Sequence, residues 1–392
     1  MARTAYFVIA DISGYTSFLT RSELDHAQSI LEGLLQTLVD HMKPPLVISN
    51  FQGDAILAYA PDSEVVQGQA ILEAVENLYC AFAAAQEQME RNTTCPCRAC
   101  QNIPKLDLKF IVHRGEYAVQ TIGGRQELGG PDVIVAHRLL KNDIASRTGI
   151  MAYALVTEAA ARAMDIADFF ASLPTHTEQY EHVGAVSARV HALHPVWQAR
   201  RSRQRIFAGP GDRLFVDPTT VDLPVSPSRA WAYVSEPAYK VRWLEGVTGM
   251  TVSGLDRGRT GVGTTQHCAH GKQVLPLKIV DWRPFEYLTH EFPLPVGATN
   301  MMTFALTPIE GGTRVGLYFK VTLPAGNPIR RALARVMLSA IRGKFTKISA
   351  QNGRNLSRLA QEDLAAQAPR PEPGRITRED VAAAAQLATT AQ

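Results

Sequence analysis

The chain has 392 residues, and its 40 basic and 37 acidic side chains leave a formal net charge of +3. This length predicts two domains, and a hydrophobic content of 46% is enough for a packed core in each. Five cysteines in so long a chain do not predict a disulfide framework. No signal-peptide pattern opens the chain, and no window holds the roughly 18 to 20 apolar residues that span a bilayer. We therefore expect a cytoplasmic protein with no membrane span.

The charge balance by itself neither favours nor excludes a nucleic-acid partner. The densest basic run, RRSRQR at residues 200–205, is short. We interpret it as part of a solvated linker rather than as an anion-binding patch. No nucleic acid is therefore expected among the partners.

Residues 1–195 alternate between strand and helix patterns, which is typical of a mixed α/β or α+β domain. A short apolar strand is expected at 6–10, and a helix follows in which leucines recur at helical spacing as far as Met42. The stretch LVISNFQGDAILAYA, residues 46–60, predicts a β-hairpin around Gly53-Asp54. Further helices are expected at about 64–91, 132–142 and 157–171, with an alternating strand at 105–119.

A basic linker is expected at 196–212, and a differently composed domain follows at 213–363. This second region has many short strand patterns separated by turn signals, and it closes with one long helical pattern that begins at Pro328. One terminal helix and many antiparallel strands predict an α+β domain of the helix-grip type. The tail at 364–392 has few core-forming residues and is predicted to be mobile.

Two aspartates stand where strand patterns end. The first apolar strand ends on Asp11, and Asp54 occupies the hairpin turn. Carboxylate oxygens suit Mg²⁺, which takes few carboxylates together with water and phosphate oxygens. If the two strands are neighbours, the two carboxylates can meet and hold a metal ion. The alternative is that each is an ordinary turn aspartate, and the spacing alone leaves both interpretations open.

Three motifs in this region resemble the signatures of class III nucleotidyl cyclases: FVIADISGYTSFL at 7–19, NFQGDAILAY at 50–59 and ELGGPDVIVAHRL at 127–139. The resemblance implies a ferredoxin-like α/β sandwich and a candidate phosphorus–oxygen lyase. It assigns a two-metal site for Mg²⁺ or Mn²⁺ to Asp11, Asp54 and the backbone carbonyl of Ile12. It assigns to Arg138 the catalytic role of steadying the phosphates. It also implies a homodimer, because the family's metal-binding and base-reading halves come from opposite subunits.

The nucleotide-binding half of the resemblance is incomplete. Ile134 replaces the family's ribose-binding asparagine, and Val183 or His182 stands at the position of a phosphate-binding lysine. The base-reading positions hold Asn50 and Glu127, which fit neither the usual adenine pair nor the usual guanine pair. Loss of one positioning group typically costs on the order of 10²-fold in rate, so weak or altered turnover is expected.

His137 and Lys141 lie close to Arg138 in the sequence and are candidates to compensate for these losses. On a continuous helix, residues four apart share one face, so the two side chains would point together. We expect them to contact the phosphates of a nucleoside triphosphate. The alternative is a plain polar helix face.

The stretch TTCPCRACQN places Cys95, Cys97 and Cys100 within six residues, between a helix and a strand. The two-residue spacing of Cys97 and Cys100 is that of zinc knuckles, so a structural Zn²⁺ is one expectation. A complete site needs a fourth ligand, for which Cys80, His113 or a residue across a dimer are candidates. The alternatives are a redox-labile pair and plain packing or surface thiols.

Three motifs in the C-terminal region resemble the START-like, or SRPBCC (polyketide-cyclase-like), superfamily: PVSPSRAWAYVSEPAYKVRWLEGV at 224–247, DWRPFEYLTHEF at 281–292 and EGGTRV at 310–315. The resemblance implies an elongated apolar cavity for a hydrophobic small molecule of lipid or polyketide type. The candidate lining residues, each of which can also be plain core, are Trp243, Trp282, Phe292, Met302, Phe304, Phe319, Met337 and Ile341. No convincing acid–base pair accompanies them, so binding is favoured over catalysis on a polyketide- or lipid-like substrate.

Together these patterns predict a cytoplasmic signalling protein. A divergent cyclase-like domain would bind metal and nucleotide with weak or altered turnover, coupled to a domain that binds a hydrophobic ligand. The alternative is a non-enzymatic ligand-binding or scaffold protein whose degenerate cyclase-like domain only dimerises. Retention of Asp11 and Asp54 favours the first interpretation, whereas Ile134 and the missing lysine favour the second.

Overall fold

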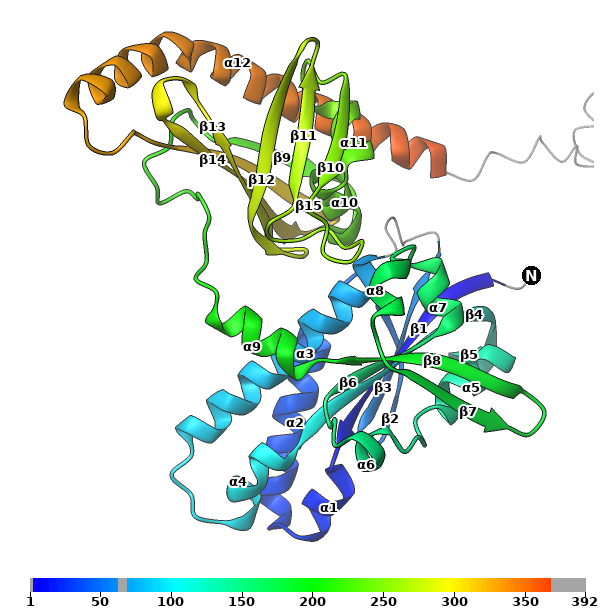
Figure 1. Ribbon diagram of the computed structural model, residues 1–392. Coiled ribbons are helices and arrows are strands. Elements are labelled where there is room, and N and C mark those ends of the chain that lie inside the picture. The colour runs from blue at the N-terminus through cyan, green and yellow to red at the C-terminus, as the bar shows by residue number, and fades with distance from the viewer. Residues whose placement is uncertain (1–2, 63–68, 368–392) are drawn as a thin grey trace, which may run out of the picture.

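The computed structural model describes residues 3–62 and 69–367, and it contains two α+β domains, each built on its own β-sheet (Figure 1). An extended segment joins the helix at the end of the first domain to the first strand of the second. The α+β fold class expected from the sequence is confirmed. Most of the tail that was predicted to be mobile, residues 368–392, lies outside the described residues.

The N-terminal sheet comprises β1 (Arg3–Ser13), β2 (Val47–Gln52), β3 (Ala55–Pro61), β4 (Asp107–Ile122), β5 (Arg125–Gly129), β6 (Tyr153–Thr157), β7 (Thr175–Tyr180) and β8 (Gly184–Ala192). Its strand order is β2-β3-β1-β4-β6-β8-β7, with β5 paired to the C-terminal end of β4. β1 pairs antiparallel with both β3 and β4, and helices connect β1 to β2 and β3 to β4. This is the βαββαβ order of a ferredoxin-like unit, as expected from the sequence.

The helices of this domain are α1 (Tyr15–Thr20), α2 (Leu24–His41), α3 (Gln69–Asn92), α4 (Arg98–Asn102), α5 (Pro131–Arg138), α6 (Ile144–Thr148), α7 (Glu158–Ala163), α8 (Ala167–Ala171) and α9 (His194–Ser202), with a 3₁₀ turn η1 (Ile103–Lys105). β1 is buried on both faces because its alternate side chains enter different cores. Val8 and Ala10 lie in the core that α2 and α3 cover, whereas Phe7 and Ile9 lie in the core that α5 covers. The central strand thereby fixes where its C-terminal end, with Asp11, emerges.

Several predicted elements differ in their bounds from the observed ones. The strand expected at 6–10 is longer, because β1 pairs with β4 from Arg3 to Ser13. The helix expected at 157–171 is divided into α7 and α8, because Asp165 between them takes a left-handed φ of 52°. The start of the helix expected at 64–91 falls in part outside the described residues, and the described helix is α3.

The C-terminal sheet comprises β9 (Thr219–Leu223), β10 (Gly249–Ser253), β11 (Thr265–His270), β12 (Gln273–Arg283), β13 (Tyr287–Pro293), β14 (Thr299–Ile309) and β15 (Gly312–Thr322). Its order is β10-β11-β12-β13-β14-β15-β9, and every neighbouring pair is antiparallel. The helical elements are α10 (Pro227–Ser235), α11 (Pro237–Trp243), η2 (Pro295–Gly297) and α12 (Pro328–Gln367). One antiparallel sheet with a long closing helix is the expected helix-grip arrangement.

α12 covers the sheet with only part of its length. Its second half buries Leu356, Leu359 and Ala360 in the core of the C-terminal domain. Ile329 and Val336 near its start are 77% and 67% exposed, and the first half of the helix extends past the sheet (Figure 1). Within the described ranges, no helix combines the length and the apolar character needed to cross a membrane.

Candidate functional sites

The carboxylates of Asp11 and Asp54 meet at one end of the N-terminal sheet. Asp11 lies near the end of β1 with Ala55 of β3 as its register partner, and Asp54 is in the turn before β3. The Ile12 backbone N–H donates to the Asp54 carbonyl oxygen at 3.4 Å. Burial raises the pKa of the Asp54 carboxyl, and the neighbouring Asp11 charge raises it further. Two carboxylates that oppose each other's ionisation form a site that attracts a cation.

A lysine already lies beside this pair. Lys109 on β4 places its Nζ 3.0 Å from an Asp11 carboxylate oxygen and 3.1 Å from the Leu140 carbonyl oxygen. Strand pairing places Lys109 opposite Asp11, since the two residues are register partners across β1 and β4. The ammonium therefore neutralises one of the two carboxylates. The sequence motifs gave no sign of this residue, although strand pairing of β1 with β4 would have identified it.

The donor set fits a hard divalent ion such as Mg²⁺ or Mn²⁺. Two carboxylates and nearby backbone oxygens are the ligands that such ions take, with water or phosphate oxygens completing the coordination. Among the residues the structure describes, no third His, Cys, Asp or Glu joins Asp11 and Asp54 at ligand distance. A metal at this site would compete with the Lys109 ammonium for Asp11.

Arg138, the predicted catalytic arginine, is directed toward the other edge of the sheet. Its Nη1 donates to the Glu181 carbonyl oxygen at 3.0 Å, and its guanidinium lies 5.8 Å from the Tyr180 ring centroid. The same β7–β8 turn carries His182 and Val183, both exposed. The structure thus brings Arg138 together with the position that lacks a lysine. Within the described part of one chain, no hydrogen bond or ion pair joins Arg138 to the two aspartates.

The remaining predicted nucleotide contacts are dispersed. Asn50 lies on β2 at an irregularity in the pairing with β3, and its buried Oδ1 has no hydrogen-bond partner. Glu127 is exposed on β5. His137 is half-buried on α5, and burial lowers its pKa.

The expectation that His137 and Lys141 share a helix face is wrong. α5 ends at Arg138, and Lys141 lies in the turn that follows. The physical reason is the Asn142 side chain, whose Oδ1 accepts from the Ile144 backbone N–H at 3.2 Å and from the Tyr153 hydroxyl at 2.7 Å. An asparagine that bonds the backbone two residues ahead favours a turn over a continued helix.

The cysteine knuckle gains a partner that the sequence analysis did not identify. The ligand atoms of His26, Cys95, Cys97 and Cys100 all lie within 4.8 Å of one another. His26 is on α2, so only the packing of α2 against α4 shows that it belongs to the cluster. The backbone N–H of Cys100 and, to a smaller extent, the His26 side chain lower the pKa of the Cys97 thiol to about 7.

Neither predicted fourth ligand lies in this cluster. Cys80 is buried in α3, and burial raises the pKa of its thiol to about 11. His113 is buried on β4, where its Nδ1 lies 2.9 Å from the Thr157 hydroxyl.

A sealed polar cluster lies inside the C-terminal domain. The Lys240 Nζ donates to Gln266 Oε1 at 2.6 Å and lies 3.0 Å from His290 Nε2, and all three side chains are fully buried. Burial lowers the pKa of Lys240 to about 7 and holds the pKa of His290 well below its usual range. The Lys240 ammonium also lies 5.4 Å from the Phe304 ring centroid.

Several polar atoms around this cluster have no hydrogen-bond partner. Both side-chain amide atoms of Asn300 and the Nδ1 of His290 are buried and unpartnered, as are Trp231 Nε1 and Ser235 Oγ. Asn300 is the register partner of Phe292, and Met302 is that of His290, so these side chains share one face of the sheet. Buried polar groups are nearly always satisfied in native proteins, so a group of unpartnered atoms at one place needs an explanation.

Most of the predicted cavity residues lie in the same core. The buried core cluster of the domain includes Trp243, Phe292, Met302, Phe304 and Phe319. Met337 and Ile341 are half-buried on α12.

The comparisons with known proteins divide the chain in the same way. Residues 218–357 match the family described as "Polyketide cyclase / dehydrase and lipid transport". The helix-grip resemblance of the C-terminal domain is thereby confirmed. Residues 31–148 match a family described as "Protein of unknown function (DUF2652)". The chain is also similar to the "Uncharacterized protein Rv2561/Rv2562" of Mycobacterium tuberculosis (strain ATCC 25618 / H37Rv), with 28% identity over 154 residues that cover 39% of this chain and 69% of that protein.

Solved structures similar to this chain include cyclases. The guanylyl cyclase Cya2 is 17% identical with a TM-score of 0.37, and the match covers 48% of this chain and 92% of that one. Protein MLL2253 from Mesorhizobium loti is 17% identical with a TM-score of 0.27, and the match covers 37% of this chain and 98% of that one. At these values the similarity carries no activity over to this chain.

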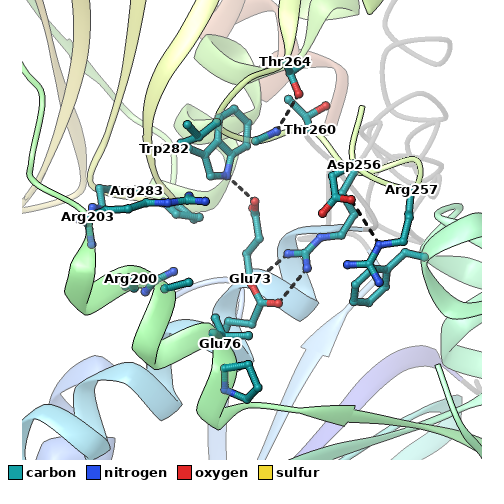
Figure 2. A pocket seen from close by; sticks show the side chains of 18 of the residues that line it. Glu73, Glu76, Arg200, Arg203, Asp256, Arg257, Thr260, Thr264, Trp282 and Arg283 are labelled. Carbon is teal, nitrogen blue, oxygen red and sulfur yellow. Dashed lines mark hydrogen bonds and ion pairs between the residues drawn. The ribbon is translucent and has the colours of Figure 1, made fainter. Parts of the chain in front are cut away.

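The polyketide-cyclase-like domain rests on α3 of the N-terminal domain through a buried ionic network (Figure 2). The Arg259 guanidinium donates two hydrogen bonds of 2.9 Å to the Glu76 carboxylate, and His191 Nε2 lies 2.9 Å from the same carboxylate. Burial opposes ionisation of Glu76, but Arg259 and His191 outweigh it and hold its pKa well below the usual range. The Gln69 side chain adds a paired contact with the Thr260 backbone, at 2.8 and 3.1 Å.

Trp282 lies at this interface and also packs against the core of the C-terminal domain, with its ring centroid 4.8 Å from that of Trp231. Its Nε1 donates to Glu73 Oε1 of α3 at 2.7 Å (Figure 2). It borders a cavity of about 390 Å³ between the domains, which Arg200, Arg203 and Arg283 also line. Trp282 is the next-to-last residue of β12, beyond an irregularity in its pairing with β13, and its register partner is Leu288 of the buried core.

Proposed function

We propose that this chain is a two-domain signalling protein in which the C-terminal domain binds a hydrophobic small molecule that carries a polar group. The observation that supports this most is the set of unpartnered polar atoms around Lys240, His290 and Asn300, inside an otherwise apolar core. An unpaired buried polar group costs about 1–3 kcal/mol, and a ligand that bonds these atoms would recover that cost. The family match to lipid-transport proteins points to the same class of ligand.

In the N-terminal domain, the proposal is metal-dependent binding of a nucleoside triphosphate. The paired Asp11 and Asp54 carboxylates would hold Mg²⁺ or Mn²⁺, which supplies positive charge to neutralise phosphate oxygens. Weak or absent turnover is expected for two reasons. Ile134 is 53% exposed and offers no hydrogen bond to a ribose, and Lys109 competes with a metal for Asp11.

A homodimer is part of this proposal. Arg138 and the aspartates do not meet within one chain, so a second copy would be needed to bring both to one nucleotide. Phe51 on β2 is 57% exposed and Ile134 on α5 is 53% exposed. Exposed large apolar side chains beside the motifs at 50–59 and 127–139 are consistent with a protein interface.

Coupling between the domains would pass through α3. This helix buries Leu72, Val75 and Phe82 in the N-terminal core, and its Glu73 and Glu76 side chains bind the C-terminal domain. A ligand that shifts β12 would therefore move α3 directly.

The test is binding and turnover of all four ribonucleoside triphosphates by the full chain, with Mn²⁺ or Mg²⁺. The control is the double variant Asp11→Ala with Asp54→Ala. Metal-dependent binding that the control loses supports the proposal, and a cyclic product lost in the control would make the protein a divergent cyclase. Absence of binding to any of the four would rule out the nucleotide half and leave the alternative, a cyclase-like domain that only dimerises.

A further inference from the structure

We propose that His26, Cys95, Cys97 and Cys100 bind one structural zinc ion. Three of these side chains come from the connection between α3 and β4, and the fourth comes from the first turn of α2. The four ligand atoms lie within 4.8 Å of one another. Three thiolates and one imidazole are a donor set of structural zinc sites in reduced compartments.

The separations of the ligand atoms match a tetrahedral site. His26 Nδ1 lies 3.3 Å from Cys97 Sγ and 3.6 Å from Cys95 Sγ. With Zn–S bonds of about 2.3 Å and a Zn–N bond of about 2.0–2.1 Å, a tetrahedron places nitrogen and sulfur roughly 3.5 Å apart. These two nitrogen–sulfur distances therefore already match those around one zinc ion.

The surrounding backbone orients these ligands. The Cys97 Sγ accepts from the Cys100 backbone N–H at 3.4 Å and so caps α4, which fixes the turn between the two cysteines. The Glu23 carboxylate, three residues before His26, accepts from the Ala99 backbone N–H at 3.0 Å. These contacts hold the start of α2 against the knuckle. Hydrogen bonds around the ligands orient them in this way in metal sites.

A zinc site accounts for this cluster better than a redox-labile cysteine pair or packing thiols do. A disulfide between Cys97 and Cys100 would need neither Cys95 nor a histidine, yet both lie within the cluster. Plain packing thiols would be buried in apolar surroundings, as Cys80 and Cys268 are. The clustered cysteines are instead partly exposed, and they converge on one imidazole nitrogen.

A zinc ion at this site would stabilise the connection between α3 and β4, which packs against the turn that follows Asp11. The Gln86 side chain on α3 donates to the Ile103 and Leu106 carbonyl oxygens, at 2.9 and 2.6 Å, which anchors the other end of the connection. The Lys105 carbonyl oxygen packs so closely on Gly14 that a Cβ there would come within 3.2 Å of it. A zinc ion would thus stabilise the segment on which the start of the Asp11 loop rests.

The test is zinc stoichiometry of the full chain, purified under reducing conditions, exposed to zinc and then freed of unbound metal. We expect one zinc per chain by elemental analysis. Replacement by Co²⁺ should give the absorption of a tetrahedral site with thiolate ligands. His26→Ala, at an exposed helix position, should weaken retention against a chelator at least tenfold, and Cys97→Ser should abolish it. Cys268→Ser, outside the cluster, should retain zinc as the wild type does.

The proposal is overturned if the wild type holds no zinc after this treatment. It is also overturned if His26→Ala and Cys97→Ser retain zinc as strongly as the wild type. Should Cys97→Ser fail to fold, His26→Ala with the cobalt spectrum still decides, because loss of one nitrogen ligand changes the spectrum. The readout is metal content, so its outcome is independent of nucleotide binding.

Discussion

The molecule buries charged and polar side chains in two regions, which differ in how many of the buried polar atoms have hydrogen-bond partners. At the domain interface, Glu76 receives two hydrogen bonds from Arg259 and a third contact from His191. On the inner face of the C-terminal sheet, His290 keeps an unpartnered nitrogen and Asn300 has no partner at all. A satisfied carboxylate such as Glu76 needs only the folded chain to explain it, whereas we propose that the unpartnered atoms of His290 and Asn300 mark a ligand site. The interface also keeps one unpartnered carboxylate oxygen, Glu73 Oε2.

The largest effect is expected at the fully bonded Glu76 carboxylate. Arg259→Ala leaves the Glu76 carboxylate buried without its main counter-ion, since Glu76 is 5% exposed. Removal of one partner of a buried pair costs about 3–5 kcal/mol, so the free energy of unfolding should fall by that amount. Denaturant unfolding measures it. The double variant Arg259→Met with Glu76→Gln should recover much of the loss, and a stability of Arg259→Ala equal to that of the wild type would remove the contrast between the regions.

The second effect has the opposite sign. Asn300→Leu replaces an unpartnered amide by an apolar group of similar shape, so the free energy of unfolding should rise by about 1–3 kcal/mol. The matched control is Asn352→Leu, because the Asn352 Oδ1 accepts from the Glu245 backbone N–H at 2.7 Å. That control should be destabilised by about 1 kcal/mol. If Asn300→Leu is destabilised as much as Asn352→Leu, the inner face is a satisfied core and the ligand argument fails.

The Asp11–Asp54 pair is a third region for comparison, because there the Lys109 ammonium supplies a positive charge. Lys109→Met removes the ammonium that lies 3.0 Å from the Asp11 carboxylate. The affinity of the full chain for Mn²⁺ should then rise roughly tenfold, equivalent to about 1.4 kcal/mol. Titration with Mn²⁺ followed by electron spin resonance measures this, with Lys43→Met as the control. Unchanged or weaker Mn²⁺ binding would mean that Lys109 does not compete for the site.

The last prediction is a difference in pH dependence between the regions. Burial raises the pKa of Glu73 to about 7, so between pH 4.5 and 7 the folded state holds a proton that the unfolded state has lost. Stability therefore falls as pH rises through that window. Burial lowers the pKa of Lys240 to about 7, so from pH 7 to 10 the unfolded state holds the extra proton and stability rises with pH. Glu73→Gln should flatten only the acid slope and Lys240→Met only the alkaline slope. Equal slopes in variants and wild type would contradict both assignments.

The sequence was sufficient for the fold because its signals are local or come in order along the chain. The hairpin at 46–60, the long final helix and the motif order predicted both domains, and the strand order agrees. The spacing alone left open whether Asp11 and Asp54 approach each other, and the resemblance to cyclase motifs implied that they do. Local sequence signals do not predict contacts between segments that are far apart in the chain.

The residues that sequence reasoning missed all act across such distances. His26 is on another helix from the cysteines, Lys109 reaches Asp11 through strand pairing, and Lys240 meets His290 from α11 to β13. Trp282 was predicted as a core or cavity residue, and its hydrogen bond to Glu73 of the other domain was missed. In each case the missing information is tertiary packing, which residue type and spacing do not encode.

The central claim is that the unpartnered atoms on the inner face of the C-terminal sheet mark a ligand site. Mass spectrometry of the full chain under non-denaturing conditions, after incubation with a total lipid extract, tests it directly. The account predicts an adduct of one small amphipathic molecule in the wild type and in Asn352→Leu, and its loss in Asn300→Leu. No adduct in the wild type, or an adduct that Asn300→Leu and His290→Phe both retain, would contradict it.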